Sequence, residues 1–152
     1  MTHSYDPPMA EKSTQSIIIA AQPADVMAVI ADFPSYPAWA ASVKSVEILS
    51  EYEHGYPSQV RFLVDAGPIK DDYTLAYEWA EDDSWVSWSL LQSTVMKSQD
   101  GSYQLAQVDG GTEVTYTLHV ETTMPMLGLL RRKGEKMIMD IALRELKKRV
   151  ER

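Results

Sequence analysis

Apolar residues recur along this chain at two different spacings, and the change of spacing separates predicted strands from predicted helices. The β-like run Ser16-Ile17-Ile18-Ile19-Ala20 predicts a strand over about 14–20. Pro23 follows it, and proline is favoured at the first position of a helix. Apolar residues at helical spacing then predict a helix over 23–32. Pro34 and Pro37 end that helix and leave room for one short turn between them.

Strict alternation of apolar and polar residues predicts a series of strands through the middle of the chain. The clearest case is 71–80, where aromatic residues alternate with polar or small ones. Further strands are predicted over 43–51, 59–65, 85–92, 95–98, 102–108 and 114–120. Glycine-containing turns separate several of them, at Ala66-Gly67-Pro68 and Gly110-Gly111, and Asp100-Gly101 predicts a hairpin between 95–98 and 102–108.

The chain closes with a predicted helix over 127–150. One apolar stripe on it comprises Leu130, Met137, Ile138, Ile141 and Ala142, and the stripe is widened by Met139, Leu143, Leu146 and Val150. A stripe this wide is typical of a helix held against a curved sheet. Gly134 lies inside the helix at a cost of about 1 kcal/mol relative to alanine.

Composition narrows the classes of protein that the chain could represent. Its 152 residues, 45% of them hydrophobic, predict one folded domain over 13–152 after a flexible arm over 1–12. There is no cysteine, and the first residues do not resemble a signal peptide, so a cytoplasmic protein is expected. The net charge of −8 argues against nucleic acid as a partner. Residues 131–152, in contrast, carry nine Lys/Arg and four acidic residues.

The sequence offers no recognisable catalytic or metal-binding group. His3, His54 and His119 are not at metal-ligand spacing, and we interpret all three as solvated. The pairs Asp71-Asp72 and Asp82-Asp83 each divide between two faces of a strand, so we interpret them as solvated turn and edge charges. No phosphate-binding loop or dinucleotide motif is present. We therefore predict no catalytic residue, no metal and no cofactor.

The order of these elements, together with Tyr36-Pro37-Ala38-Trp39 and Gly111-Thr112-Glu113-Val114, resembles the START-like (SRPBCC) superfamily. Within it the chain is similar to the polyketide cyclase/dehydrase and lipid-transport family over about residues 14–151. The resemblance implies an α+β helix-grip fold. In that fold a curved antiparallel sheet of six or seven strands wraps a long C-terminal helix, and two short helices follow the first strand around an apolar cavity.

Aromatic residues carry the functional prediction. An inward-facing set can be drawn from the strands, although an ordinary aromatic core explains it equally well; what favours a cavity is the polar hydroxyl on each tyrosine. The predicted lining comprises Trp39, Phe62, Tyr73, Tyr77, Trp88, Tyr116, Met137 and Ile141. We predict binding or transport of an apolar small molecule, such as a lipid, polyketide or isoprenoid-like compound.

The alternative is a polyketide cyclase/dehydratase acting on a poly-β-ketone-like substrate, with Tyr73, Tyr77 or Arg61 orienting or protonating it. The resemblance implies that such enzymes use an Arg and a Tyr in the pocket. Val43 stands at the position of that Tyr, and the Asp71-Asp72 region replaces the Arg. These departures favour binding over catalysis. Stable membrane insertion is not expected, whereas weak membrane or protein docking through the basic C-terminal helix stays an open alternative.

Overall fold

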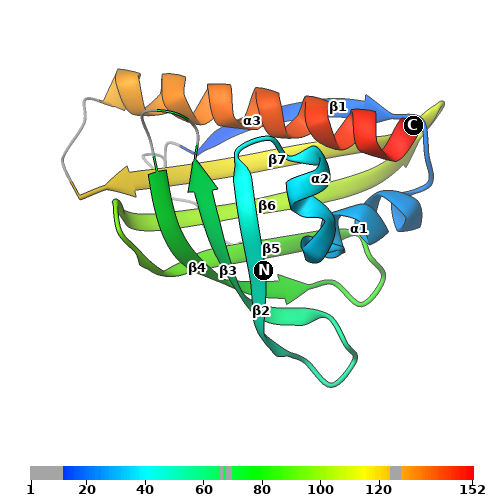
Figure 1. Cartoon of the computed structure of the whole chain (residues 1–152). Helices are drawn as coiled ribbons and strands as arrows, with labels where there is room; N and C mark the ends of the chain where they lie inside the picture. Colours follow the sequence, from blue (N-terminus) through cyan, green and yellow to red (C-terminus); the bar gives the residue numbers. More distant parts are fainter. Residues whose placement is uncertain (1–11, 66, 68–69, 124–127) are drawn as a thin grey trace, which may run out of the picture.

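A computed structural model describes residues 12–65, 67, 70–123 and 128–152. Within these residues, three helices, seven strands and one 3-10 turn follow each other in the predicted order, except that one strand replaces the two predicted over 95–98 and 102–108 (Figure 1). The elements are β1 (Ser13–Ile19), α1 (Pro23–Ala31), the 3-10 turn η2 (Phe33–Ser35), α2 (Tyr36–Trp39), β2 (Val43–Glu51), β3 (Pro57–Asp65), β4 (Lys70–Trp79), β5 (Trp85–Ser93), β6 (Met96–Val108), β7 (Gly111–Thr122) and α3 (Gly128–Glu151).

All seven strands form one antiparallel sheet in the order β1-β7-β6-β5-β4-β3-β2. The sheet curves, and α3 runs along the side formed by β1 and β7, which it contacts directly (Figure 1). Helices α1 and α2 lie near the C-terminal end of α3 and contact it. This arrangement is the α+β helix-grip fold expected from the sequence.

The side of the sheet that faces α3 follows from strict alternation along the strands. In β7, Thr112, Val114, Tyr116 and Leu118 are all buried, and the residues between them are partly exposed. Because successive side chains in a strand point to opposite faces, these four side chains lie on one face of the sheet. Burial of that face against α3 and α1 creates the hydrophobic core.

The buried face of α3 differs from the predicted one. Met139, Leu143 and Leu146 are buried, whereas Met137 is 59% and Ile141 44% exposed. The predicted stripe is therefore wrong at Leu130, Met137, Ile138 and Ile141, which are exposed, whereas the residues predicted to widen it are the ones that pack inward, with Ala142 partly buried beside them. The helix is apolar on two faces, and the one that packs inward also carries Glu135, whose carboxylate accepts hydrogen bonds from Ser13 and Val120 there.

The hairpin predicted at Asp100-Gly101 is also wrong. β6 runs without interruption from Met96 to Val108, and the connection to β5 lies at Thr94 and Val95 instead. Gly101 is in the strand because the indole of Trp88 occupies the space beside its Cα: a Cβ at this position would lie 2.6 Å from Trp88 Nε1 and closer still to the ring carbons. A glycine inside a strand often marks such a close approach.

Some predictions fall on residues outside the described part of the chain. Except for Lys12, the arm over 1–12 lies outside it, as do Ala66 and Pro68 of the predicted turn and Leu127 at the predicted start of the last helix. Within the described part, no helix has both the length and the apolar character that crossing a membrane requires.

Candidate functional site

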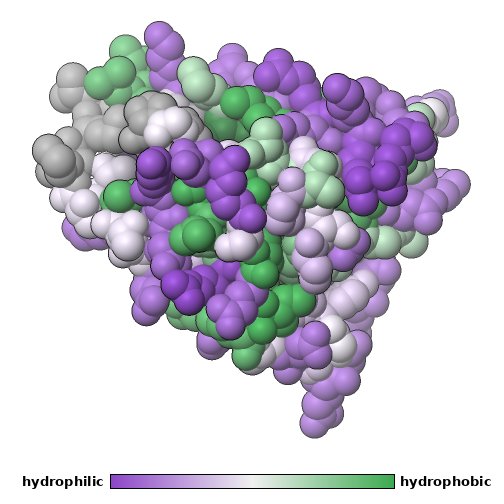
Figure 2. All heavy atoms as spheres, viewed as in Figure 1, coloured by the Kyte–Doolittle hydropathy of each residue, from purple (hydrophilic) through white to green (hydrophobic). Residues whose placement is uncertain are grey.

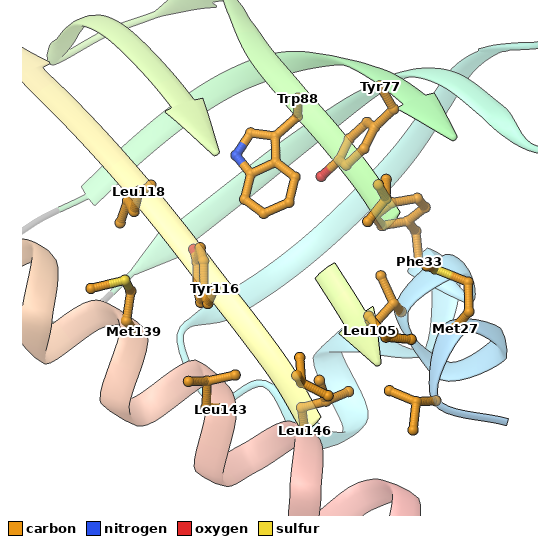
Figure 3. Close-up of a cluster of buried hydrophobic side chains, with 14 of the residues drawn as sticks. Met27, Phe33, Tyr77, Trp88, Leu105, Tyr116, Leu118, Met139, Leu143 and Leu146 are labelled. Atoms are coloured by element: carbon orange, nitrogen blue, oxygen red, sulfur yellow. The ribbon is translucent and has the colours of Figure 1, made fainter. Parts of the chain in front are cut away.

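Aromatic side chains from neighbouring strands meet on the concave side of the sheet. β3, β4, β5, β6 and β7 place their aromatic residues in register, so that rings pack across the strands; the rings in this group are Phe62, Tyr73, Tyr77, Trp88, Tyr103 and Tyr116. Neighbouring centroids lie 4.6–5.8 Å apart. Figure 3 shows Tyr77, Trp88 and Tyr116 extending from the sheet toward the side chains of α3. The concave face is thus an aromatic surface.

Four phenolic hydroxyls of this surface have no hydrogen-bond partner among the described residues. They belong to Tyr73, Tyr77, Tyr103 and Tyr116. Burial raises the pKa of each phenol above its ordinary value, and the neighbouring tyrosines add to the shift for Tyr77, Tyr103 and Tyr116. All four therefore stay protonated at neutral pH, and each can donate one hydrogen bond and accept others. Among the described residues, only Trp39 Nε1 is a fully buried side-chain polar atom without a partner, so the four hydroxyls keep accessible surface and can bind water or a bound molecule.

Trp88 differs from these tyrosines because its polar atom is satisfied. Its Nε1 donates a hydrogen bond of 2.9 Å to Gln99 Oε1, and its indole lies over Gly101. The ring is therefore held in one orientation between Tyr77 on one side and Tyr103 and Tyr116 on the other. Trp88 gives the aromatic surface a rigid centre.

The helical segment after β1 closes one end of this interior. Phe33 packs on Phe62 and Tyr77, and the hydroxyl of Tyr36 donates a hydrogen bond of 2.6 Å to the carbonyl of Ile30. Trp39 packs against Tyr36, and its Nε1 is buried without a partner among the described residues. The segment that follows α1, from Phe33 to Trp39, therefore contributes rings to the core and one unsatisfied donor.

The remaining wall of the interior is aliphatic. Met139, Leu143 and Leu146 of α3 face the sheet and pack in one cluster with Leu118 of β7 (Figure 3). The six predicted aromatic residues, Trp39, Phe62, Tyr73, Tyr77, Trp88 and Tyr116, all belong to the core or pack against it. Met137 and Ile141 do not join them, because they lie on the exposed face of α3.

Sequence reasoning chose the wrong helix residues because α3 offers two apolar stripes of similar quality. No local signal separates them, because the buried stripe shares its face with Glu135 at helical spacing. An isolated acidic residue on an apolar face is usually a sign of exposure. Here it marks the buried face, because partners on β1 and β7 satisfy the carboxylate.

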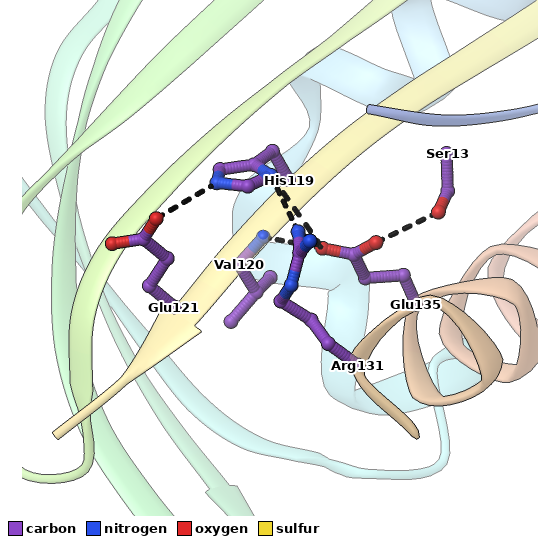
Figure 4. A network of polar contacts seen from close by, with 6 residues as sticks. All are labelled: Ser13, His119, Val120, Glu121, Arg131 and Glu135. Atoms are coloured by element: carbon purple, nitrogen blue, oxygen red, sulfur yellow. Dashed lines mark hydrogen bonds and ion pairs between the residues drawn. The ribbon is translucent and has the colours of Figure 1, made fainter. Parts of the chain in front are cut away.

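Glu135 is 2% exposed and lies at the centre of a polar network (Figure 4). Ser13 Oγ donates to Oε1 at 2.7 Å, and the backbone N–H of Val120 donates to Oε2 at 2.6 Å. β1 begins at Ser13, opposite Leu118, so the N–H of Val120 lies beyond the end of its partner strand. Arg131 Nη1 lies 3.6 Å from the same carboxylate. The network fastens α3 to the sheet.

His119 takes part in this network and is not the solvated residue that the sequence predicts. Its side chain is 18% exposed; Nδ1 lies 2.8 Å from Arg131 Nη1, and Nε2 lies 3.3 Å from Glu121 Oε2. The alternation along β7 does place it on the outward face, but Arg131 of α3 reaches over that face and covers the ring (Figure 4). The contacts identify His119 as a structural residue.

The acidic pair Asp71-Asp72 also has a different role from the predicted one. Asp71 is 6% exposed, and its carboxylate accepts hydrogen bonds from the hydroxyls of Ser93 and Thr94 and from the N–H of Thr94. It therefore stabilises the turn between β5 and β6. Asp72 is on the outer face, where Arg61 binds it through two hydrogen bonds of 2.9 and 2.7 Å. Arg61 points away from the interior, as predicted.

The arrangement places apolar side chains and phenolic hydroxyls on one surface, but it lacks an evident base. The charged side chains nearest to the core, those of Asp71 and Glu135, are occupied by structural partners. Among the described residues, no group of three or more potential metal ligands occurs. Protonated phenols are thus the available polar chemistry.

Comparisons with known proteins agree with this architecture. A START superfamily protein from Mycobacterium smegmatis has a TM-score of 0.86 at 23% identity, covering 92% of this chain and 97% of its own. A protein from Thermus thermophilus has a TM-score of 0.75 at 21% identity, covering 91% of this chain and 96% of its own. The ZhuI aromatase/cyclase from a Streptomyces species has a TM-score of 0.73 at 17% identity, covering 93% of each chain. At these identities the similarity establishes the fold alone.

Sequence comparison supplies the family. No curated protein matches the chain. The family model described as polyketide cyclase/dehydrase and lipid transport, however, matches residues 10–151. That match covers the whole sheet, all three helices and every residue of the aromatic surface, so the chain belongs to the polyketide cyclase/dehydrase and lipid transport family.

Proposed function

We propose that the protein binds an apolar small molecule between α3 and the concave face of the sheet. The observation that supports this most directly is the set of four hydroxyls, on Tyr73, Tyr77, Tyr103 and Tyr116, without a partner among the described residues. These hydroxyls keep accessible surface on an apolar face, where a ligand with polar atoms could pair with them in place of water. An elongated compound with oxygen atoms, such as a polyketide, an isoprenoid-like compound or a lipid, offers such partners.

The proposed affinity comes mainly from apolar area. Ligand sites of this class are lined by hydrophobic and aromatic side chains, and a few polar groups determine orientation. The sheet contributes Phe62, Trp88 and the tyrosines, and Trp39 contributes from α2. We assign the helix side of the lining to Met139 and Leu143, in place of Met137 and Ile141.

Filling the interior tests this proposal. Ala142 is partly buried and packs against the core, so Ala142→Trp places a large ring between α3 and the sheet. Ala106 is exposed on β6, so Ala106→Trp adds the same ring outside the interior. The probe is the neutral fluorophore N-phenyl-1-naphthylamine, and circular dichroism checks that each variant is folded. We expect Ala106→Trp to bind the probe like the unmodified protein and Ala142→Trp to bind at least about tenfold more weakly. Equal affinity in both variants would overturn the proposal.

The same residues support a second candidate, cyclisation of a poly-β-ketone-like substrate. The aromatase/cyclase among the structural neighbours has the same fold, and phenols with a raised pKa are protonated donors that could polarise a ketone. If the protein only binds, Tyr73→Phe and Tyr77→Phe each weaken affinity by about 0.5–1.5 kcal/mol. If it catalyses, each lowers turnover by about 10²–10⁴-fold while binding is retained.

Tyr56→Phe is the matched control for this series, because its hydroxyl donates to Asp83 away from the interior. We expect the binding result, because the interior has no free base to accept a proton from the substrate. Cyclised product from a model poly-β-ketone, lost in Tyr73→Phe and Tyr77→Phe but not in Tyr56→Phe, would establish catalysis instead.

A further inference from the structure

The outer face of α3 carries a continuous ridge of apolar and basic side chains. Residues three and four apart lie above one another on a helix, and this spacing connects Leu130, Lys133, Met137, Ile141, Arg144 and Lys148, which we call the α3 ridge. Leu130 is 54%, Met137 59% and Ile141 44% exposed, and the three basic residues are exposed as well. At a rise of about 1.5 Å per residue, the ridge is about 27 Å long.

The apolar side chains of the ridge belong to a larger exposed group. Of the eleven large hydrophobic residues exposed in the described part of the chain, five are on α3, where Leu129 and Ile138 complete the group. Figure 2 shows apolar atoms interspersed with hydrophilic ones along this edge of the molecule. Single exposed apolar residues need no explanation, but a group of this size on one helix indicates an interaction surface.

The basic side chains of this surface are not neutralised by acidic ones. Lys133, Lys136, Arg144 and Lys148 form no ion pair with another described residue. The acidic residues of α3 mostly turn back to the body of the protein, since Glu135 binds Val120, Glu145 binds the N–H of Ala41, and Glu151 binds Lys147 and the N–H of Ala20. The outward charge of the helix is therefore strongly positive.

The positive charge is confined to the C-terminal helix, and this limits the classes of partner that could bind it. Residues 131–152 have a net charge of +5, whereas the rest of the chain carries −13. A negatively charged, extended surface would attract the ridge and repel the other faces of the molecule, which would orient the protein on it. Apolar side chains flanked by Lys and Arg are the composition of helices that lie in the interface of anionic bilayers.

We propose that the α3 ridge docks the protein on a membrane surface that contains anionic lipid. Leu130, Met137 and Ile141 insert at the level of the headgroups, and Lys133, Arg144 and Lys148 bind lipid phosphates and carboxylates. The opposite face of α3 stays packed on the sheet, so docking needs no change in the fold. The proposal concerns the outer face of α3 and does not depend on which molecule the interior binds.

Co-sedimentation with vesicles tests the docking. The vesicles are phosphatidylcholine alone or phosphatidylcholine mixed with phosphatidylserine. We expect binding to the mixed vesicles only, weakened by salt. Met137→Gln/Ile141→Gln should lower the partition coefficient about tenfold or more, because both apolar side chains are lost while helix propensity is kept. Each of Lys133→Gln, Arg144→Gln and Lys148→Gln should lower it about fivefold.

Matched controls separate this surface from general effects. Leu91→Gln removes an equally exposed apolar residue on β5, and Lys97→Gln removes an exposed charge on β6. Both should bind the mixed vesicles like the unmodified protein. Equal binding to both kinds of vesicle, no binding to either, or equal loss in the control variants would overturn the proposal. So would a dimer in solution that dissociates in Met137→Gln/Ile141→Gln, because the ridge would then be a contact between copies of this chain.

Discussion

Replacing glycine by alanine at Gly101 and at Gly134 should change the stability of the fold in opposite directions. Gly101 lies in β6 opposite Trp88, and an added Cβ would lie 2.6 Å from Trp88 Nε1 and nearer still to Cε2 and Cζ2. Gly134 lies in α3, and nothing surrounds its Cβ position within 4 Å. We expect Gly101→Ala to destabilise the fold and Gly134→Ala to stabilise it.

The loss of folding stability expected for Gly101→Ala depends on how firmly the indole of Trp88 is held. The indole would have to retreat by about 1 Å to reach ordinary van der Waals separation. Its Nε1 is bound to Gln99, and three tyrosine rings pack around it with centroids 5.3–5.8 Å away. Overpacking at such a site costs about 1–3 kcal/mol. Gly134→Ala, on the exposed face of a helix, should gain about 0.8–1 kcal/mol.

Urea denaturation, followed by circular dichroism, measures both variants. The midpoint should fall for Gly101→Ala and rise for Gly134→Ala while the slope of the transition stays the same. The fluorescence of Trp88 should also change in Gly101→Ala, because its ring must move. If Gly101→Ala were as stable as the unmodified protein, Trp88 would not lie over β6 as described, and the rigid centre of the aromatic surface would be wrong.

Two substitutions and one pH titration test the roles of the charged and titratable groups. Glu135→Leu should cost about 2–3 kcal/mol, measured by urea denaturation, because the N–H of Val120 and the hydroxyl of Ser13 lose a charged acceptor; a neutral effect would contradict the network. The pKa of Asp72 is lowered by its hydrogen bonds to Arg61, so its contribution to stability is present above the ordinary pKa near 3.8 and is lost as the pH falls below it. Asp72→Asn should therefore flatten the acid limb of the stability profile, and an unchanged profile would show that the pair contributes nothing. Burial raises the pKa of Tyr36, Tyr73, Tyr77, Tyr103 and Tyr116, so their phenolate absorbance should appear only as the protein unfolds at alkaline pH; ionisation of all eight tyrosines near their ordinary pKa of 10.0 in the folded protein would contradict their burial.

The sequence predicted the strands well because alternation reports burial directly. β4, where Tyr73, Leu75, Tyr77 and Trp79 alternate with polar or small residues, matches its predicted range within one residue at each end, although Thr74 is buried as well. The hairpin at Asp100-Gly101 failed because a glycine has two uses, to turn the chain or to make room for a ring. Only the position of Trp88 on the neighbouring strand distinguishes them, and pairing between strands is not a local property of the sequence.

The aromatic part of the site could also be predicted, whereas its helical part could not. Phe62, Tyr77 and Trp88 occupy the inward phase of their strands, so their burial follows from the pattern alone. α3 is apolar on two faces, and the inward one also carries the buried carboxylate of Glu135, whose partners on β1 and β7 cannot be read from the sequence of the helix. The same ambiguity led sequence reasoning to place Leu130, Met137 and Ile141, the apolar residues of the α3 ridge, in the stripe held by the sheet.

The central claim, that an apolar molecule binds against the tyrosines of the concave face, is tested most directly by NMR of protein labelled with ¹³C in its tyrosine rings. Tyr→Phe variants assign the signals, and a saturating amount of N-phenyl-1-naphthylamine is then added. Binding in the interior should shift the signals of Tyr73, Tyr77, Tyr103 and Tyr116 and leave that of Tyr56, which binds Asp83 away from the core, in place. Shifts confined to Tyr56, or none at saturation, would show that the interior does not bind the ligand.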